Sequence, residues 1–89
     1  LRRAVTLRDH CCRFPGCTQP PVACQVHHLR PRSLDGPTSL GNLALLCRFH
    51  HLIAVHRWGW TLRLHPDGTT TATGPDGRTL GGLSPPRAA

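Results

Sequence analysis

Five cysteines and seven histidines stand in a chain of only 89 residues, and this density of metal-binding side chains limits what the chain can fold into. A domain of this length buries a modest part of its surface and often needs disulfides or a structural metal to be stable. The odd number of cysteines, interleaved with paired histidines, favours zinc in a reducing compartment. We therefore expect a zinc-stabilised domain and keep a disulfide-stabilised secreted domain as an alternative.

The charge of the chain comes from eleven arginines and four aspartates, with no lysine and no glutamate, and the formal net charge is +7. The absence of lysine excludes Schiff-base chemistry, and the few scattered carboxylates disfavour a carboxylate-pair glycosidase. A positive field over a small domain favours polyanionic partners such as nucleic acid. A GC-rich genome would produce a similar arginine bias, so composition alone leaves both explanations open.

No stretch of the sequence is apolar for long enough to span a membrane, and no signal-peptide pattern opens it. We therefore expect a cytoplasmic protein with no membrane partner. The chain contains no methionine, even at position 1, and this indicates that the N-terminal region of a longer parent protein precedes it. The oligomeric state is not readable from the sequence.

Local patterns predict four segments along the chain. Residues 1–10 form a short basic amphipathic segment, the end of a preceding element. Residues 11–59 form the metal-binding core, with a strand over 22–29, an apolar run at 43–46, and a helix over 48–58 that ends at Gly59. Residues 60–80 alternate apolar and polar side chains around two Pro-Asp-Gly turns, which predicts a β meander. Residues 81–89 are predicted to be a flexible tail.

The cysteine spacing predicts a structural zinc site of the Cys3His type. A Pro-Gly turn lies between Cys12 and Cys17 and brings their sulfurs together, and Cys47 with His50 forms a second half-site at the start of the helix. A site closed by four protein ligands is structural rather than catalytic. Cys11 competes with Cys12 for the same position, and we favour Cys12 because it centres the turn.

The remaining cysteine and histidines divide into different environments. Cys24 is expected to be a small buried strand residue rather than a ligand. His27 and His28 are neighbours on a strand and point to opposite faces, so one can bind a metal while the other faces substrate. His50 and His51 are about 100° apart on a helix, so His51 is free to serve a second metal ion.

The ordered pattern of these residues resembles a known family. His27-His28, then Asn42-Leu43, then Leu46-Cys47-x-x-His50-His51 is similar to the HNH motif of the ββα-metal endonucleases, in the zinc-bound form that has two further cysteines upstream. The resemblance covers about residues 1 to 80. It is strongest to HNH domains at the C-terminus of bacterial proteins whose N-terminal region is poorly characterised.

The resemblance implies a role for each residue of the motif. It makes His28 the general base that deprotonates the attacking water, and Asn42 the residue that holds the loop and so orients that base. It makes His27 and His51 ligands of one catalytic divalent ion. His50 takes the structural-zinc position at which many relatives have cysteine.

His56 departs from the family pattern. Some relatives place a third metal-binding histidine four residues after the helix ligand, but His56 follows His51 by five residues. On a regular α-helix this spacing turns it about 140° away, so we treat His56 as a secondary candidate ligand.

We therefore predict an α+β fold: a small zinc-stabilised ββα-metal unit with a C-terminal β meander. The predicted function is that of an endonuclease which hydrolyses phosphodiester bonds of DNA with one divalent ion, which could be Zn²⁺, Ni²⁺, Mn²⁺ or Mg²⁺. Arg30, Arg32 and Arg48 are the candidates for phosphate contacts. The alternative is a non-catalytic nucleic-acid-binding zinc module.

Overall fold

The computed structural model describes residues 1–81, and the predicted tail lies almost entirely outside this range. It contains helix α1 (Arg2–Asp9), strands β1 (Cys24–His28) and β2 (Leu43–Cys47), helix η4 (Phe49–Val55), and strands β3 (Thr61–Leu64), β4 (Thr70–Thr73) and β5 (Thr79–Gly81). Single 3₁₀ turns at Pro21–Ala23, Arg32–Leu34 and Leu40–Asn42 complete it. The predicted α+β class is confirmed.

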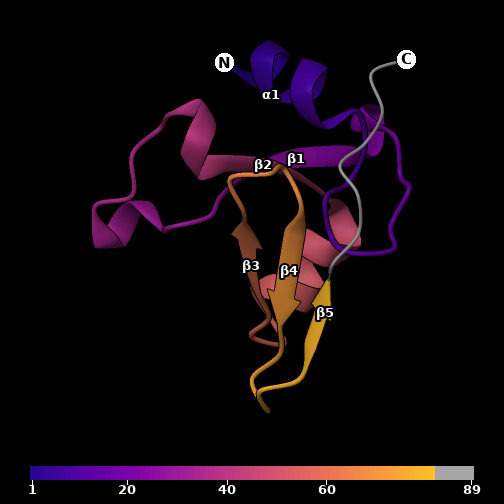
Figure 1. The fold of residues 1–89 in the computed structure, drawn as a ribbon, viewed down its shortest axis with the longest axis vertical. Coiled ribbons are helices and arrows are strands. Elements are labelled where there is room, and N and C mark those ends of the chain that lie inside the picture. The colour runs from indigo at the N-terminus through magenta and orange to yellow at the C-terminus, as the bar shows by residue number, and fades with distance from the viewer. Residues whose placement is uncertain (82–89) are drawn as a thin grey trace.

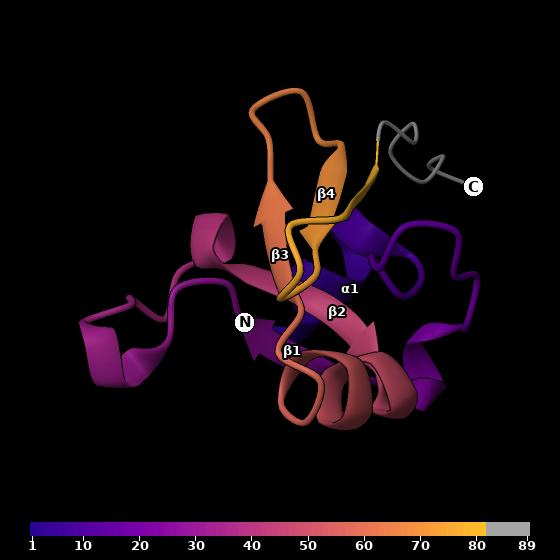
Figure 2. The ribbon, with the colours of Figure 1, turned by 90° about the horizontal axis from the view of Figure 1, so that it is seen from below.

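Two antiparallel sheets make up the β structure. Strands β1 and β2 pair with Cys24 opposite Cys47 and His28 opposite Leu43. Strands β3, β4 and β5 form the predicted meander. Figure 1 shows the β1–β2 pair lying across the molecule between α1 on one side and the meander on the other. Figure 2 shows η4 beside the end of β2, and the loop that connects β1 with β2 projecting away from the body.

Strand β2 is the centre of the core. All five of its residues are buried, because α1 packs against it through the fully buried Val5, while Phe14 and Leu62 belong to the same apolar cluster. A strand buried on both faces needs a continuous apolar run, and Leu43-Ala44-Leu45-Leu46 supplies one. Because β2 leads directly into η4, this rigid strand fixes where the helix begins.

The strand predicted over 22–29 is shorter than expected at its start. Pro21 begins a 3₁₀ turn over Pro21–Ala23, and Val22 is 91 % exposed. Proline lacks the N–H that a strand interior needs, so the ladder begins only at Cys24.

The predicted helix over 48–58 is present, but its core is a π-helix rather than an α-helix. The N–H of His56 donates to the carbonyl of His51 (3.2 Å) and that of Trp58 to the carbonyl of Ile53 (2.8 Å), both across five residues. The chain leaves the helix through Gly59, whose φ of +79° lies in the left-handed region that glycine adopts without strain.

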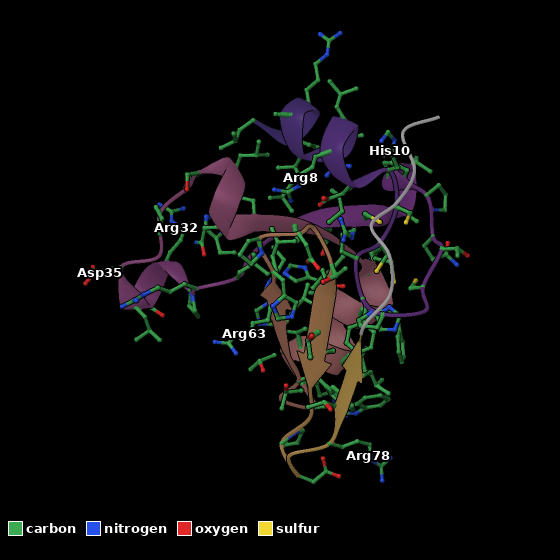
Figure 3. The ribbon with its side chains drawn as sticks, in the orientation of Figure 1. Arg8, His10, Arg32, Asp35, Arg63 and Arg78 are labelled. Atoms are coloured by element: carbon green, nitrogen blue, oxygen red, sulfur yellow. The ribbon has the colours of Figure 1, made fainter. Side chains whose placement is uncertain are left out.

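Asp9 is a fully buried carboxylate that joins three parts of the fold. Its oxygens accept hydrogen bonds from Arg8 (2.7 and 3.0 Å), from Arg13 (3.2 Å) and from the backbone N–H of Leu45 in β2 (3.0 Å). Arg13 also donates to the carbonyl of Gly68 in the turn between β3 and β4. Figure 3 shows Arg8 between α1 and the β1–β2 pair. The ion cluster therefore links α1, β2 and the meander.

None of the helices formed by residues 1–81 is both long enough and apolar enough to cross a lipid bilayer.

Candidate metal centres and active site

Four ligand atoms from three segments converge at one end of β2. The side chains are those of Cys12, Cys17, Cys47 and His50, and their sulfur and nitrogen atoms all lie within 4.8 Å of one another. Sγ of Cys17 is 4.0 Å from Sγ of Cys47, and Nδ1 of His50 is 3.2 Å from Sγ of Cys47 and 3.7 Å from Sγ of Cys12. Two sulfurs on one tetrahedral zinc lie about 3.8 Å apart, so this donor set fits zinc.

The turn between Cys12 and Cys17 holds the first half of this cluster in place. The N–H of Cys17 donates to the carbonyl of Phe14 (3.0 Å), and Gly16 takes a φ of +85°. The ring of Phe14 stacks on His50 with a centroid distance of 4.1 Å and an interplanar angle of 6°. The aromatic contact fixes the imidazole in the orientation that presents Nδ1 to the sulfurs.

Burial disfavours the charged form of two ligands in this cluster, Cys12 and His50. It raises the pKa of the Cys12 thiol, and it lowers the pKa of His50. Thiolates that burial alone would keep protonated are stabilised when a metal cation replaces the proton. The chemistry of the donors therefore agrees with a closed structural metal site.

The other two cysteines lie outside this cluster. Sγ of Cys11 lies 3.4 Å from the carbonyl of Cys12, and the buried Cys24 thiol donates to the carbonyl of Pro20 at 3.3 Å. Burial raises the pKa of Cys24 to about 11, which keeps it an inert thiol. All five cysteines are free, so the structure contains no bridge of the kind a disulfide framework requires.

A second cluster consists of three histidines from two elements. His27 on β1, His51 on η4 and His56 directly after η4 bring one ring nitrogen each within 4.8 Å of the others. The Nε2 atoms of His51 and His56 are 3.1 Å apart, and the ring centroids of His27 and His51 are 5.3 Å apart. Three converging imidazoles with no carboxylate are a donor set for one borderline transition-metal ion.

The expectation that His56 points away from His51 is wrong, and the π-helix is the reason. An α-helix returns to the same side after about four residues, whereas the five-residue hydrogen bonds of a π-helix widen the turn. The fifth residue then comes back over the first. His56 is thus as close to His51 as a histidine four residues away would be on an α-helix.

Burial favours the neutral form of His27 and of His51. Burial and, after it, the neighbouring imidazoles of His51, His56 and His28 lower the pKa of His27 to about 4. Burial and then His56 lower the pKa of His51. A neutral imidazole offers a lone pair and a protonated one does not, so the site is held in the form that binds a cation.

Gln25 is a site residue that the sequence reasoning missed. Its Oε1 lies 2.6 Å from Nδ1 of His51, so Nδ1–H donates to the amide and Nε2 is left facing the cluster. Gln25 and His27 are two residues apart on β1 and therefore share a face of the strand. The sequence signal for Gln25 was its spacing from His27, because residues two apart on a strand lie on the same face.

His28 lies at the same cavity as the histidine cluster but makes its own contact. The cavity has a volume of about 280 Å³, and both His28 and the three clustered histidines line it. Nε2 of His28 is 3.0 Å from Oγ1 of Thr38. When Nε2–H donates to this hydroxyl, Nδ1 carries the free lone pair that a base needs.

Asn42 connects the two ends of the loop between β1 and β2 through hydrogen bonds. Its Oδ1 accepts from the N–H of Arg30 (2.8 Å), and its Nδ2 donates to the carbonyls of Arg30 (3.1 Å) and Pro37 (2.8 Å). The N–H of Leu29 donates to the carbonyl of Asn42 (2.8 Å). These bonds hold the segment that carries Thr38, and Thr38 in turn contacts His28.

The three arginines singled out from the sequence are placed differently. Arg32 lines the cavity of the histidine cluster, and Figure 3 shows it on the projecting loop. The Nε–H of Arg30 donates to the carbonyl of Leu34 (2.7 Å), so this side chain stabilises the loop. Arg48 is exposed at the start of η4 and does not line that cavity.

Comparison with known proteins finds a family model that matches part of this chain. Residues 10–49 match the model of the HNH endonuclease family. The uncharacterized protein Rv3776 of Mycobacterium tuberculosis is 47 % identical over 79 residues, which is 89 % of this chain and 15 % of that protein. The uncharacterized protein Rv2100 of the same organism is 44 % identical over 79 residues, 89 % of this chain and 14 % of that protein.

A more distant relative, the uncharacterized protein Rv1128c of Mycobacterium tuberculosis, is 38 % identical over 63 residues, 71 % of this chain and 14 % of its own length. The chain thus spans about one seventh of the length of the curated relatives it matches. No solved structure matches it significantly.

Proposed function

We propose, from the match of residues 10–49 to the HNH endonuclease family, that this chain is a metal-dependent endonuclease that hydrolyses phosphodiester bonds of DNA. The observation that carries the proposal is the shared cavity: three converging histidines that can hold one cation, and His28, lie at one surface pocket together with Arg32. This is the set of groups that a single-metal hydrolysis with a histidine base requires.

His27, His51 and His56 are the proposed ligands of the catalytic ion. When bound, a divalent cation supplies charge neutralisation to the reacting phosphate and to the leaving 3′ oxygen. A ligand set made only of imidazoles suits zinc, nickel or manganese better than magnesium, which prefers oxygen. Two-metal cleavage normally depends on bridging carboxylates, and none of the described residues supplies one at this cavity.

His28 is the proposed general base. A water oxygen attacks phosphorus, the bond to the 3′ oxygen breaks, and the proton of the water passes to Nδ1 of His28. Thr38 keeps the other ring nitrogen occupied, and Asn42 holds the loop that carries Thr38. Arg32 is placed to contact a non-bridging phosphate oxygen, because it is the arginine that lines the cavity.

The Cys12, Cys17, Cys47 and His50 cluster is proposed to bind a structural zinc ion. It ties the N-terminal turn to the end of β2 and the first turn of η4. Zinc bound there fixes the start of the helix that carries His51 and His56, so it supports the catalytic site without taking part in the reaction.

The test is a plasmid cleavage assay with the zinc-loaded protein and a panel of divalent ions. We expect cleavage that requires an added cation, and we expect His28→Ala to slow it by about a hundredfold or more with the zinc content unchanged. The matched control is His65→Ala, because His65 lies in the meander, bonded to Thr71 and outside both clusters.

Two results would change the proposal in different ways. Full activity in His28→Ala rejects this histidine as the base. Salt-sensitive DNA binding without cleavage under every metal tested supports the non-catalytic zinc module instead.

A further inference from the structure

A second cavity opens directly beside the one that holds the histidine cluster. Its volume is about 250 Å³, and it shares His27, Pro31 and His56 with the first cavity. The two cavities are therefore adjacent and together form what we call the trench, and two of the three proposed ligands of the catalytic ion, His27 and His56, line both.

The two halves of the trench differ in chemistry. The first half is lined by His28 and Arg32. The second half is lined by the apolar side chains of Leu29, Val55 and Leu62, and by Trp60, and none of residues 1–81 contributes an arginine or a carboxylate to it. The first half thus suits an anion, and the second half suits an uncharged ring with apolar faces.

The two halves fit neighbouring parts of a nucleic acid, in which each phosphate is bonded to nucleosides. A phosphate held beside the three histidines carries a nucleoside on each side, and a nucleoside on the side away from Arg32 lies next to the second half of the trench. A paired base in a duplex is covered on both faces by its neighbours and so cannot enter an apolar groove. A base without a pairing partner can leave the stack at a cost of a few kcal/mol.

We propose that the apolar half of the trench receives an unpaired nucleobase adjacent to the scissile phosphate, so that the preferred substrate is single-stranded or locally unpaired DNA. The inference rests on the proposed endonuclease function and adds the substrate class to it. Aromatic and apolar side chains beside a phosphate site are the recognised means of holding unstacked bases without reading their sequence.

The experiment compares three oligonucleotides of one sequence: a fully paired duplex, the same duplex with an unpaired nucleotide at the mapped cleavage position, and the single strand. We expect kcat/KM to be about five- to a hundredfold higher for the unpaired substrates than for the paired duplex. Equal rates on all three overturn the inference and leave the endonuclease function intact. No metal-dependent cleavage of any of them rejects the endonuclease function itself.

Filling the apolar half of the trench with a larger side chain gives a second, independent measurement. Thr61 is an exposed residue of β3 that lines the apolar half of the trench. The indole side chain of Thr61→Trp therefore fills this half and does not enter the protein core. Thr79→Trp adds the same bulk at an exposed position of β5 outside the trench and serves as the control. We expect Thr61→Trp to remove the preference for unpaired DNA, while Thr79→Trp and Thr61→Val keep it. An unchanged preference in a folded, zinc-loaded Thr61→Trp protein overturns the inference.

Discussion

The Nε2 atoms of His51 and His56 lie 3.1 Å apart although five residues separate them along the chain. The π-helical hydrogen bonds of Phe49–Val55 bring them together, and His27 on β1 completes the group. A π-helix is rare, which indicates a cost relative to the α-helix, and it occurs frequently at functional sites. A bound ion shared by the three imidazoles would supply stabilisation that offsets this cost.

His56→Ala should therefore weaken binding of the catalytic ion by about tenfold or more, because it removes one of three converging ligands. The measurement is titration of the zinc-loaded protein with Ni²⁺ or Mn²⁺ by calorimetry. Arg57→Ala is the matched control, since Arg57 is the exposed neighbour on the same turn. Equal affinity in the wild type and His56→Ala would remove His56 from the ligand set.

Replacement of Gln25 tests how His51 is oriented. In Gln25→Met the side chain keeps its length but loses the oxygen that accepts from Nδ1–H of His51. Loss of such a supporting partner lowers metal affinity by about 10–100-fold. Gln25→Glu retains an acceptor and should restore binding. If the methionine and glutamate variants bind the ion equally weakly, the amide serves packing rather than orientation.

Much of this arrangement follows from local sequence rules, and the exceptions have physical reasons. The Cys-x4-Cys turn, the apolar run of β2 and the paired histidines predicted the two clusters, because metal ligands and buried strands have short-range signatures. The π-helix was not predictable, because a segment of seven residues is too short for its apolar pattern to distinguish the period of a π-helix from that of an α-helix.

Asp9 shows a different limit of sequence reasoning. From the sequence it was one of four scattered carboxylates, yet it is the fully buried partner of Arg8 and Arg13. Nothing in the residues next to it indicates burial. The need for a carboxylate there arises only when α1, β2 and the meander are assembled around it.

The zinc site makes a prediction about adjacent cysteines. Cys12→Ser should lower the zinc content below one equivalent and lower the thermal midpoint, because three ligands hold zinc far less tightly than four in a domain with so small a core. Cys11→Ser should change neither, since its sulfur lies outside the cluster. Elemental analysis and circular dichroism measure the two effects. Zinc loss in Cys11→Ser but not in Cys12→Ser would reverse the assignment.

Asp9→Asn should destabilise the zinc-loaded protein by roughly 3–5 kcal/mol, because it leaves the buried guanidinium of Arg13 without its anionic partner. Urea unfolding gives the free energy. Asp76→Asn is the control: Asp76 pairs with Arg78 at 3.9 Å in an exposed turn, so its loss should cost less than about 1 kcal/mol. Similar losses in both variants would show that the Asp9 cluster does not depend on its charge.

The last prediction concerns the loop that positions His28. A Cβ added at Gly36 would lie 1.8 Å from the carbonyl oxygen of Arg30, which is backbone that Asn42 also holds. Gly36→Ala must therefore displace the loop and, with it, the Thr38 hydroxyl that contacts His28. We expect cleavage to fall by about tenfold or more, since small displacements of a base cost rate steeply, while the zinc content stays at one equivalent.

Gly41→Ala provides the comparison in the same loop, because no atom lies within 4 Å of the Cβ that it would add. Its cleavage rate should match that of the wild type. If Gly36→Ala cleaves DNA at the wild-type rate, the loop does not orient His28 and the chain from Asn42 through Thr38 to the base has no catalytic role. If both variants cleave DNA slowly, the loop tolerates no added side chain at either glycine. The loss of cleavage is then explained by contact of the loop with the substrate and not by its support of His28.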